Sequence, residues 1–171
     1  MTATLQTPRL VLRQPHKGDW PAYHDFMNSD RAEFFKTRDD LGKIWQTFAA
    51  DLGHWEMFDQ GLWAVTLRGD DTAVGYVGPW TPPHWPESEI GWMIFDPAIE
   101  GTGIATEAAS AAIKHAYDVL GWTTAVSYIA EGNTRSIRLA EKLGAKLDPS
   151  AAKTGENVLV YRHPVPKGVK L

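Results

Sequence analysis

The stretch that decides the fold is Glu100-Gly101-Thr102-Gly103-Ile104-Ala105-Thr106-Glu107-Ala108. A strand-like apolar run, residues 90–95, precedes it, and an alanine-rich helical pattern over residues 103–120 follows it. The first N–H groups of a helix have no partner within the helix, and the helix dipole makes that end partly positive. Glycine lets an anion approach the backbone closely. A strand, a glycine turn and a helix N-terminus therefore predict an anion site, and our hypothesis is that the anion is a pyrophosphate.

Two other phosphate-binding motifs fit this stretch poorly. A dinucleotide fingerprint, G-x-G-x-x-G, needs glycine where Thr106 stands, and it follows the first strand of a βαβ unit. The P-loop string G-x-x-x-x-G-K-[ST] does not occur in the chain. The glycines alone also fit a plain turn into a helix with no ligand.

The surrounding sequence resembles the GNAT acetyltransferase superfamily. In that family an R/Q-x-x-G-x-G/A loop binds the pyrophosphate of coenzyme A, and residues 100–105 match it except that Glu100 stands where Arg or Gln is usual. The resemblance is specific to the ribosomal-protein N-terminal acetyltransferase-like (Rim-type) branch in three segments. These are the G-x-G-x-A-T-E-A string of residues 101–108, the opening strand of residues 7–13, and the N-x-x-S…E-K-x-G pattern of residues 133–144.

The resemblance implies an α/β GNAT fold over one domain, residues 1–171. Its sheet is mixed and mostly antiparallel, with a splayed central pair of strands, and helices flank it. Local patterns agree with this architecture. They predict an edge strand at residues 10–13, further strands at 62–67, 73–78, 89–95, 124–129 and 157–162, and helices at 19–28, 31–35, 40–60, 103–120 and 133–143. Asp19 is expected to cap the first of these helices, and the spacing within residues 40–60 places Trp45 on its apolar face.

Composition excludes several classes of function. The net charge is −4 and no basic cluster exists, which argues against a nucleic-acid or membrane-surface partner and is compatible with a cationic substrate. The absence of cysteine excludes disulfides, thiolate metal sites and a Cys nucleophile, and the six histidines show no H-x-x-x-H spacing for a metal. Residues 1–6 lack the features of a signal peptide, and no apolar run approaches the ~20 residues of a membrane span. We expect a cytoplasmic protein.

Glu89 is the candidate general base. An amine must lose a proton before it can attack a thioester, and the family often places a carboxylate at this strand position, acting through a water. Glu87, two residues away on the same side of the strand, is the competing candidate. The alternative for Glu89 is a solvated carboxylate at a strand end.

Ser136 is the candidate donor to the departing thiolate. Many family members use a tyrosine seven residues after the Asn, but Ala140 stands there. The Rim-type branch has serine three residues after the Asn, as at Ser136. Asn133 is expected both to cap a helix and to contact the pantetheine arm. The alternative is ordinary first-turn helix chemistry with no ligand.

The resemblance also implies a wider set of cofactor contacts. The strand at 93–95 offers backbone groups to the pantetheine amides, the N–H of Met93 or Ile94 serves as oxyanion donor, and Arg138 and Lys142 meet the adenosine phosphates. Glu107 lies in a first helical turn, where acids are favoured, and we interpret it as structural. The full candidate set for coenzyme A is Met93, Ile94, Phe95, Glu100, Gly101, Thr102, Gly103, Ile104, Ala105, Thr106, Asn133, Ser136, Arg138 and Lys142.

These observations predict an acetyl-CoA-dependent N-acetyltransferase that works by direct attack of an amine in a ternary complex, without metal. A protein or peptide α-amine is the first expectation for the acceptor. The alternatives are a small-molecule amine (polyamine, amino sugar or amino acid) and a non-catalytic acyl-CoA-binding module. The segments 19–60 and 81–86 are expected to form the acceptor pocket, and the aromatic residues are compatible with a homodimer.

Overall fold

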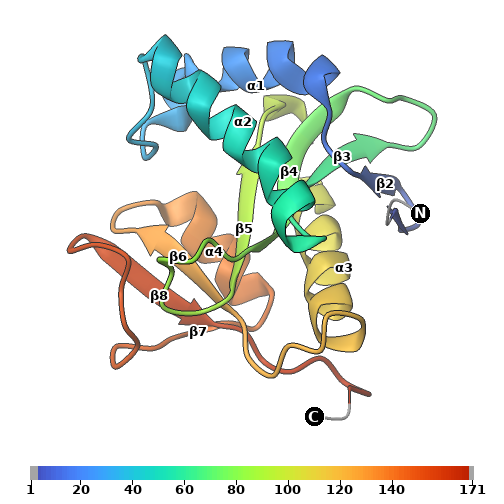
Figure 1. Cartoon of the computed structure of the whole chain (residues 1–171). Helices are drawn as coiled ribbons and strands as arrows, with labels where there is room; N and C mark the ends of the chain where they lie inside the picture. Colours follow the sequence, from blue (N-terminus) through green and yellow to red (C-terminus); the bar gives the residue numbers. More distant parts are fainter. Residues whose placement is uncertain (1–3, 170–171) are drawn as a thin grey trace.

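An eight-stranded sheet runs through the computed structural model of the chain, which describes residues 4–169 (Figure 1). The strand order is β1-β2-β3-β4-β5-β6-β8-β7, and every neighbouring pair is antiparallel except β5 and β6. The mixed, mostly antiparallel sheet predicted from the sequence is thereby confirmed. The strands are β1 (Leu5–Gln6), β2 (Leu10–Arg13), β3 (Trp63–Leu67), β4 (Ala73–Trp80), β5 (Glu89–Ile94), β6 (Val126–Ala130), β7 (Lys146–Leu147) and β8 (Val158–Arg162).

Helices cover both faces of the sheet. The helices α1 (Trp20–Met27) and α2 (Leu41–Phe58) pack together on one face, and α3 (Ile104–Asp118) and α4 (Thr134–Lys142) lie on the other (Figure 1). Short 3-10 helices span Lys17–Asp19, Asp30–Ala32 and Pro97–Ile99. No helix within residues 4–169 is both long and apolar enough to traverse a bilayer.

The small residues of α3 let it lie close to the sheet. Ala108, Ala109 and Ala112 are fully buried and pack against side chains of β2, β3 and β4. An apolar stripe of alanines removes area from water while keeping the helix axis near the strands. The opposite core, under α1 and α2, is built from larger rings, including Tyr23 and Phe48. The helix α3, which begins directly after the glycine turn of residues 101–103, is therefore packed closely against β4 and β5.

The parallel pair β5–β6 separates soon after it begins. Glu89 and Val126 are its one registered pair, and Val126 N donates to Ser88 O at 3.1 Å. Beyond that point the Ile90 carbonyl accepts from Ser127 Oγ at 2.6 Å instead of from a backbone N–H. A side-chain hydrogen bond thus stands where the next backbone hydrogen bond between β5 and β6 would lie, and the two strands diverge in Figure 1. This confirms the predicted splay.

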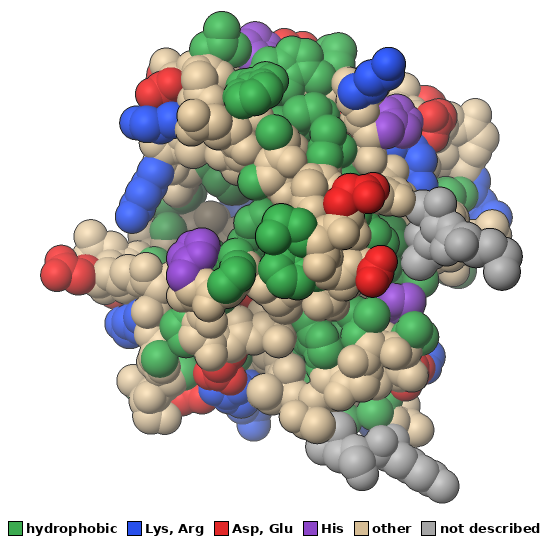
Figure 2. All heavy atoms as spheres, viewed as in Figure 1, with side chains coloured by type: hydrophobic (Ala, Val, Ile, Leu, Met, Phe, Trp, Pro, Cys, Tyr) green, Lys and Arg blue, Asp and Glu red, His purple; other side chains and the backbone are tan. Residues whose placement is uncertain are grey.

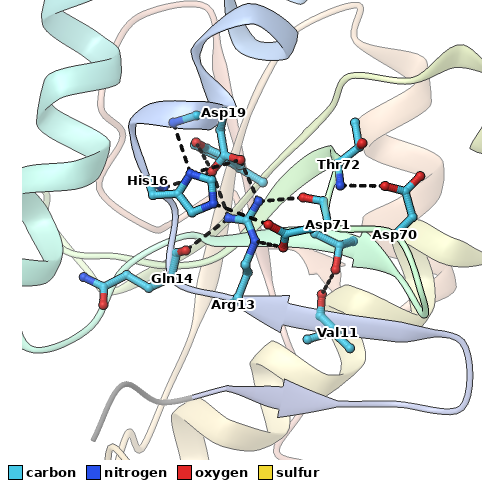
Figure 3. Close-up of polar contacts among 11 residues, drawn as sticks. Val11, Arg13, Gln14, His16, Asp19, Asp70, Asp71 and Thr72 are labelled. Carbon is cyan, nitrogen blue, oxygen red and sulfur yellow. Dashed lines mark hydrogen bonds and ion pairs between the residues drawn. The ribbon is translucent and has the colours of Figure 1, made fainter.

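A charged cluster fixes the start of α1 to the β3–β4 hairpin (Figure 3). Arg13 on β2 donates to Asp19 at 2.7 and 3.0 Å and to Asp71 at 2.6 Å. The buried Asp19 also accepts from the backbone N–H of His16 at 3.0 Å and from the Tyr76 hydroxyl at 3.2 Å. Asp19 is the N-cap residue of α1, as predicted, but its side chain makes no capping hydrogen bond, because Arg13 and His16 occupy its oxygens.

Several boundaries differ from the sequence prediction. The strand β2 is not an edge strand, because a turn closed by Thr7 N to Leu10 O, 3.1 Å, brings β1 back alongside it. Residues 31–35 form no helix beyond the 3-10 turn Asp30–Ala32. The helix α2 ends at Phe58, because Asp59 adopts a left-handed conformation with φ 54°. Strands β1 and β7 were not predicted, since two residues carry too little pattern. Residues 1–3, part of the segment without signal-peptide features, lie outside the described residues.

Candidate active site

A cavity of about 730 Å³ opens where β5 and β6 diverge. Figure 2 shows the surface hollowed between the upper helical layer and the lower C-terminal half of the molecule. Most of the predicted site residues line this cavity, whereas Phe95, Thr102 and Ile104 do not. The predicted residues on its wall are Glu89, Met93, Ile94, Glu100, Gly101, Gly103, Ala105, Thr106, Asn133, Ser136, Arg138 and Lys142.

The turn before α3 presents free helix N–H groups to the cavity. Gly101 and Gly103 have φ of 73° and 83°, a region that side chains other than glycine's rarely adopt. Gly103 is the N-cap residue and supplies no side-chain acceptor to the first helical turn. The orphan N–H groups and the helix dipole therefore favour an anion here.

Glu107 ties this turn to the N-terminal strands. Its carboxylate accepts from Thr7 Oγ1 at 2.6 Å, from Arg9 N at 3.0 Å and from Arg9 Nε at 2.6 Å. Arg9 also donates from Nη1 to the Thr102 carbonyl at 2.9 Å. These contacts hold the pKa of Glu107 below its ordinary value against the opposing effect of burial. They agree with the structural role interpreted from the sequence.

Glu100, which stands where the family has Arg or Gln, is neutralised by arginines. Its Oε1 accepts from Arg31 Nη2 at 2.7 Å and lies 3.3 Å from Arg135 Nη1. Arg31 donates in addition to the Ile94 carbonyl at 2.9 Å. The repulsion expected between Glu100 and a bound pyrophosphate is thus reduced by two guanidinium groups. Arg31 lies 69 positions before Glu100, and no sequence motif pointed to it.

Glu89 is buried at the point where the strands separate. Its side chain is 9% exposed and accepts from Trp85 Nε1 at 2.5 Å and from Tyr128 N at 3.4 Å. Burial raises the pKa of Glu89 to about 7, and these two hydrogen bonds oppose the rise only in part. The carboxyl is therefore poised to exchange a proton near neutral pH.

Glu87, the competing base candidate, is engaged elsewhere. Arg162 donates to its two oxygens at 2.7 and 2.9 Å, and this pair lowers the pKa of Glu87. Glu87 is also absent from the cavity wall. The geometry therefore favours Glu89 over Glu87 as the base.

Asn133 and Ser136 form the first turn of α4 at the opposite wall. Asn133 Oδ1 accepts from Ser136 N at 3.2 Å, which confirms the predicted helix cap. Ser136 Oγ accepts from Trp92 Nε1 at 3.2 Å. Because the indole nitrogen can only donate, the serine hydroxyl keeps its own proton for a group in the cavity.

The backbone of β5 offers alternate residues to the cavity. Ile90 and Ile94 direct their carbonyls away from β4, since these accept from Ser127 and Arg31. Phe95 N donates to Val74 O on the β4 side at 2.8 Å. Backbone groups of successive residues in a strand point to opposite sides. The backbone groups of Trp92 and Ile94 therefore point into the gap between β5 and β6, and those of Met93 point toward β4.

Asp51 is an acidic residue on the cavity wall that the sequence analysis missed. It lies on α2, is 2% exposed, and its Oδ2 has no hydrogen-bond partner among residues 4–169. Burial raises the pKa of Asp51 to about 7, and the nearby Tyr23 hydroxyl opposes this in part. The available signal was an acid among the buried Ile44, Phe48 and Trp55. The sequence placed Trp45 on that face instead, which is wrong, since Trp45 is 60% exposed.

A Ser–His pair also touches the cavity but is not arranged as a nucleophile. Ser127 Oγ lies 2.8 Å from His163 Nε2 and donates its proton to the Ile90 carbonyl. His163 Nε2–H is then the donor to Ser127, and burial lowers the pKa of His163 to about 4. A serine proton directed at a carbonyl does not activate the oxygen. The pair instead bridges the diverging strands.

The described part of the chain, residues 4–169, contains no group of three or more His, Asp or Glu side chains placed to hold a metal ion. The buried His54 on α2 has both ring nitrogens occupied within the protein. Its Nδ1 lies 2.7 Å from the Gln60 carbonyl, Nε2 accepts from Thr81 N at 3.0 Å, and its ring stacks on Trp80. It orients the cavity's aromatic wall.

Comparisons with known proteins agree with this geometry. The family description "Acetyltransferase (GNAT) domain" matches residues 9–146. A solved acetyltransferase from Agrobacterium tumefaciens is 38% identical, with a TM-score of 0.89 over 95% of this chain and 94% of that one. A ribosomal L7/L12 α-N-protein acetyltransferase in complex with coenzyme A shares the fold at 14% identity, with a TM-score of 0.73 over 95% of this chain and 98% of that one.

A curated relative matches part of the chain. The L-2,4-diaminobutyric acid acetyltransferase of Streptomyces avermitilis is 31% identical over 93 residues. That match covers 52% of this chain and 52% of the relative, so the chain spans about half the length of the curated relative it matches.

Proposed function

The chain belongs to the GNAT acetyltransferase family, and we propose that it transfers the acetyl group of acetyl-CoA to a primary amine with Glu89 as the general base. The domain over residues 9–146 is of the N-acetyltransferase type, for which acetyl-CoA is the acyl donor. The observation that carries the proposal is the buried carboxyl of Glu89 at the mouth of the splay, with a pKa near 7.

The residues of the cavity fit coenzyme A. The glycine turn and the open N-terminus of α3 suit the pyrophosphate. The backbone groups of Trp92 and the N–H of Ile94, on the gap side of β5, suit the amides of an extended arm, while the Ile94 carbonyl is held by Arg31. Arg138 and Lys142 on α4 supply positive charge for the adenosine phosphates. Acetyl-CoA contributes the activated thioester.

Glu89 removes the proton that blocks the amine. An ammonium has no lone pair, so its proton passes to the Glu89 carboxylate, directly or through a water, before the C–N bond forms and the C–S bond breaks. Trp85 and the Tyr128 N–H hold the carboxylate in position. A pKa near 7 leaves about half of the carboxyls ionised at neutral pH, and the proton is later released to solvent.

Ser136 passes a proton to the leaving sulfur and takes in exchange the second proton that the amine nitrogen loses as the amide forms, so the serine hydroxyl is restored. Its hydroxyl oxygen accepts from Trp92, which directs the hydroxyl proton toward the cavity. The N–H of Ile94, on the gap side of β5, is positioned as a donor to the thioester oxygen as charge develops there. No step involves a covalent bond to the protein, in keeping with the absence of an activated nucleophile in the described cavity wall.

The acceptor class follows from the cavity and the relatives. The sequence favoured a protein or peptide α-amine, and the Rim-type neighbours match at low identity, which supports the fold alone. The diaminobutyric acid acetyltransferase supports a small amine. We favour the small amine, because the acceptor side of the cavity is enclosed by α2 and the aromatic residues Trp80 and Trp85.

The test is release of coenzyme A thiol from acetyl-CoA in the presence of a panel of amines and peptides. We expect acetylation of small amines that is lost in Glu89→Gln, with acetyl-CoA binding retained. Binding of acetyl-CoA without release of thiol for any amine would contradict the proposal and support a non-catalytic acyl-CoA-binding module.

A further inference from the structure

The charged residues of the cavity are divided between its two ends. The basic residues Arg31, Arg135, Arg138 and Lys142 lie on the Asp30–Ala32 turn and on α4, beside the phosphate loop, and Glu100 there is paired with two of them. The other two acids of the wall, Asp51 and Glu89, have no cationic partner among residues 4–169. Asp51 and Glu89 are therefore the acids of the cavity wall that the described chain leaves without a cation.

Asp51 is the less explained of these two acids. Glu89 receives hydrogen bonds from Trp85 and Tyr128. Asp51, only 2% exposed, has the neutral Tyr23 hydroxyl nearby, but its Oδ2 makes no hydrogen bond of standard length and angle within residues 4–169. Burying a carboxylate without a partner is costly, and the cost is offset only when a cation or donor reaches it. The cavity that Asp51 lines is the route by which such a group can arrive.

The walls beside Asp51 suit an ammonium group. The aromatic residues Trp80 and Phe35 line the same cavity as Asp51. Tyr23 and Tyr76 lie near Asp51 but are fully buried and outside the cavity wall, and as neutral phenols they bring no cation to the carboxylate. Aromatic rings next to a carboxylate attract an ammonium through both cation–π and ion-pair contacts.

We propose that Asp51 binds a second ammonium group of the acceptor, so that the preferred substrate is a short diamine or diamino acid. One amine is acetylated at Glu89, and the other pairs with Asp51. A peptide α-amine with an uncharged first side chain leaves Asp51 unpaired, which places such peptides at a disadvantage. The inference rests on the proposed function, since it specifies the acceptor of the same site.

The experiment compares α,ω-diamines of about three to six carbons with n-alkyl monoamines of equal length. Binding to the acetyl-CoA-free protein is measured by calorimetry, and acetyl transfer is measured by thiol release. We expect at least one diamine to bind and react about tenfold better than its monoamine, and Asp51→Asn to abolish that preference by raising KM for the diamine while leaving the monoamine unchanged. Asp25→Asn, on the exposed face of α1, is the matched control.

The outcomes separate the two proposals. Equal binding of diamines and monoamines by the wild type, or a diamine preference that survives in a folded Asp51→Asn variant, would overturn the role of Asp51. If the diamine preference in binding is present and vanishes in Asp51→Asn, but no amine gives thiol release, then the inference about Asp51 holds and the proposed acetyl transfer fails.

Discussion

Replacing Glu89 by Gln is the perturbation whose effect the structure specifies most fully. The amide keeps the size of the side chain but cannot accept a proton from the amine. Loss of a general base lowers turnover by about 10²- to 10⁴-fold. Because Glu89 contacts Trp85 and Tyr128 and makes no contact with the glycine turn, we expect the dissociation constant for acetyl-CoA to change by less than about twofold.

The pH dependence gives the sharper readout. With a pKa of about 7, the ionised fraction of Glu89 rises from about one-tenth near pH 6 to about nine-tenths near pH 8, so wild-type kcat should rise about tenfold over that range. A carboxyl with the ordinary value of 4.5 would already be ionised at pH 6 and would give no such rise.

The assay is thiol release at saturating acetyl-CoA and amine between about pH 5.5 and 8.5. Glu87→Gln is the matched control, since Glu87 lies two residues earlier and pairs with Arg162 instead of lining the cavity. We expect the Glu87→Gln control to show the same rise of kcat between pH 6 and pH 8 as the wild type. If the Glu89→Gln variant keeps the wild-type turnover and the rise of kcat near pH 7, the assignment of Glu89 as the base is refuted.

Three further predictions concern the phosphate turn, its ion pairs and the buried acid. Gly103→Glu should abolish acetyl-CoA binding in calorimetry, while Gly69→Glu, which carries the same positive-φ strain in an exposed turn, should bind normally. Glu100→Gln should tighten acetyl-CoA about three- to tenfold at low salt, more than Glu33→Gln does, because it removes a negative charge beside the pyrophosphate; equal affinities would contradict this. Asp51→Asn should raise the free energy of unfolding by about 4 kcal/mol near pH 8 and by about 2 near pH 5, measured with urea.

The sign of that last effect follows from proton binding. The folded-state pKa of Asp51, about 7, lies above its ordinary value of 3.8, so between these values the folded protein holds a proton that the unfolded chain has released. Stability of the wild type therefore falls as pH rises through this window and levels off above it. A variant whose advantage over wild type does not grow between pH 5 and 8 would show that Asp51 is not a desolvated carboxyl.

The sequence predicted the parts of the fold that repeat a strong local pattern. The alanine stripe of α3, the turn at Gly101 and Gly103, and the Asn133 cap are local features, and each is found where expected. The splay between β5 and β6 came from the family resemblance, and the Ser127 hydroxyl that bridges the diverging strands in place of a backbone donor is visible only in three dimensions.

The parts that could not be predicted depend on contacts between distant residues. Glu100 and Arg31 pair across 69 positions of the sequence. Glu87 and Arg162 pair across 75 positions, and this ion pair is why Glu87 is a poor candidate for the base. The burial of Asp51 follows from how α2 rotates against the sheet, and the sequence pattern placed the exposed Trp45 on that face instead.

The measurement that tests the central claim most directly is calorimetric titration with acetyl-CoA, followed by addition of a short diamine, with NADH as the control ligand. The account predicts that acetyl-CoA binds with a dissociation constant on the order of micromolar and that NADH does not bind. It also predicts that free thiol is released once the amine is added. Failure of acetyl-CoA to bind would contradict the account of this cavity as an acetyltransferase site.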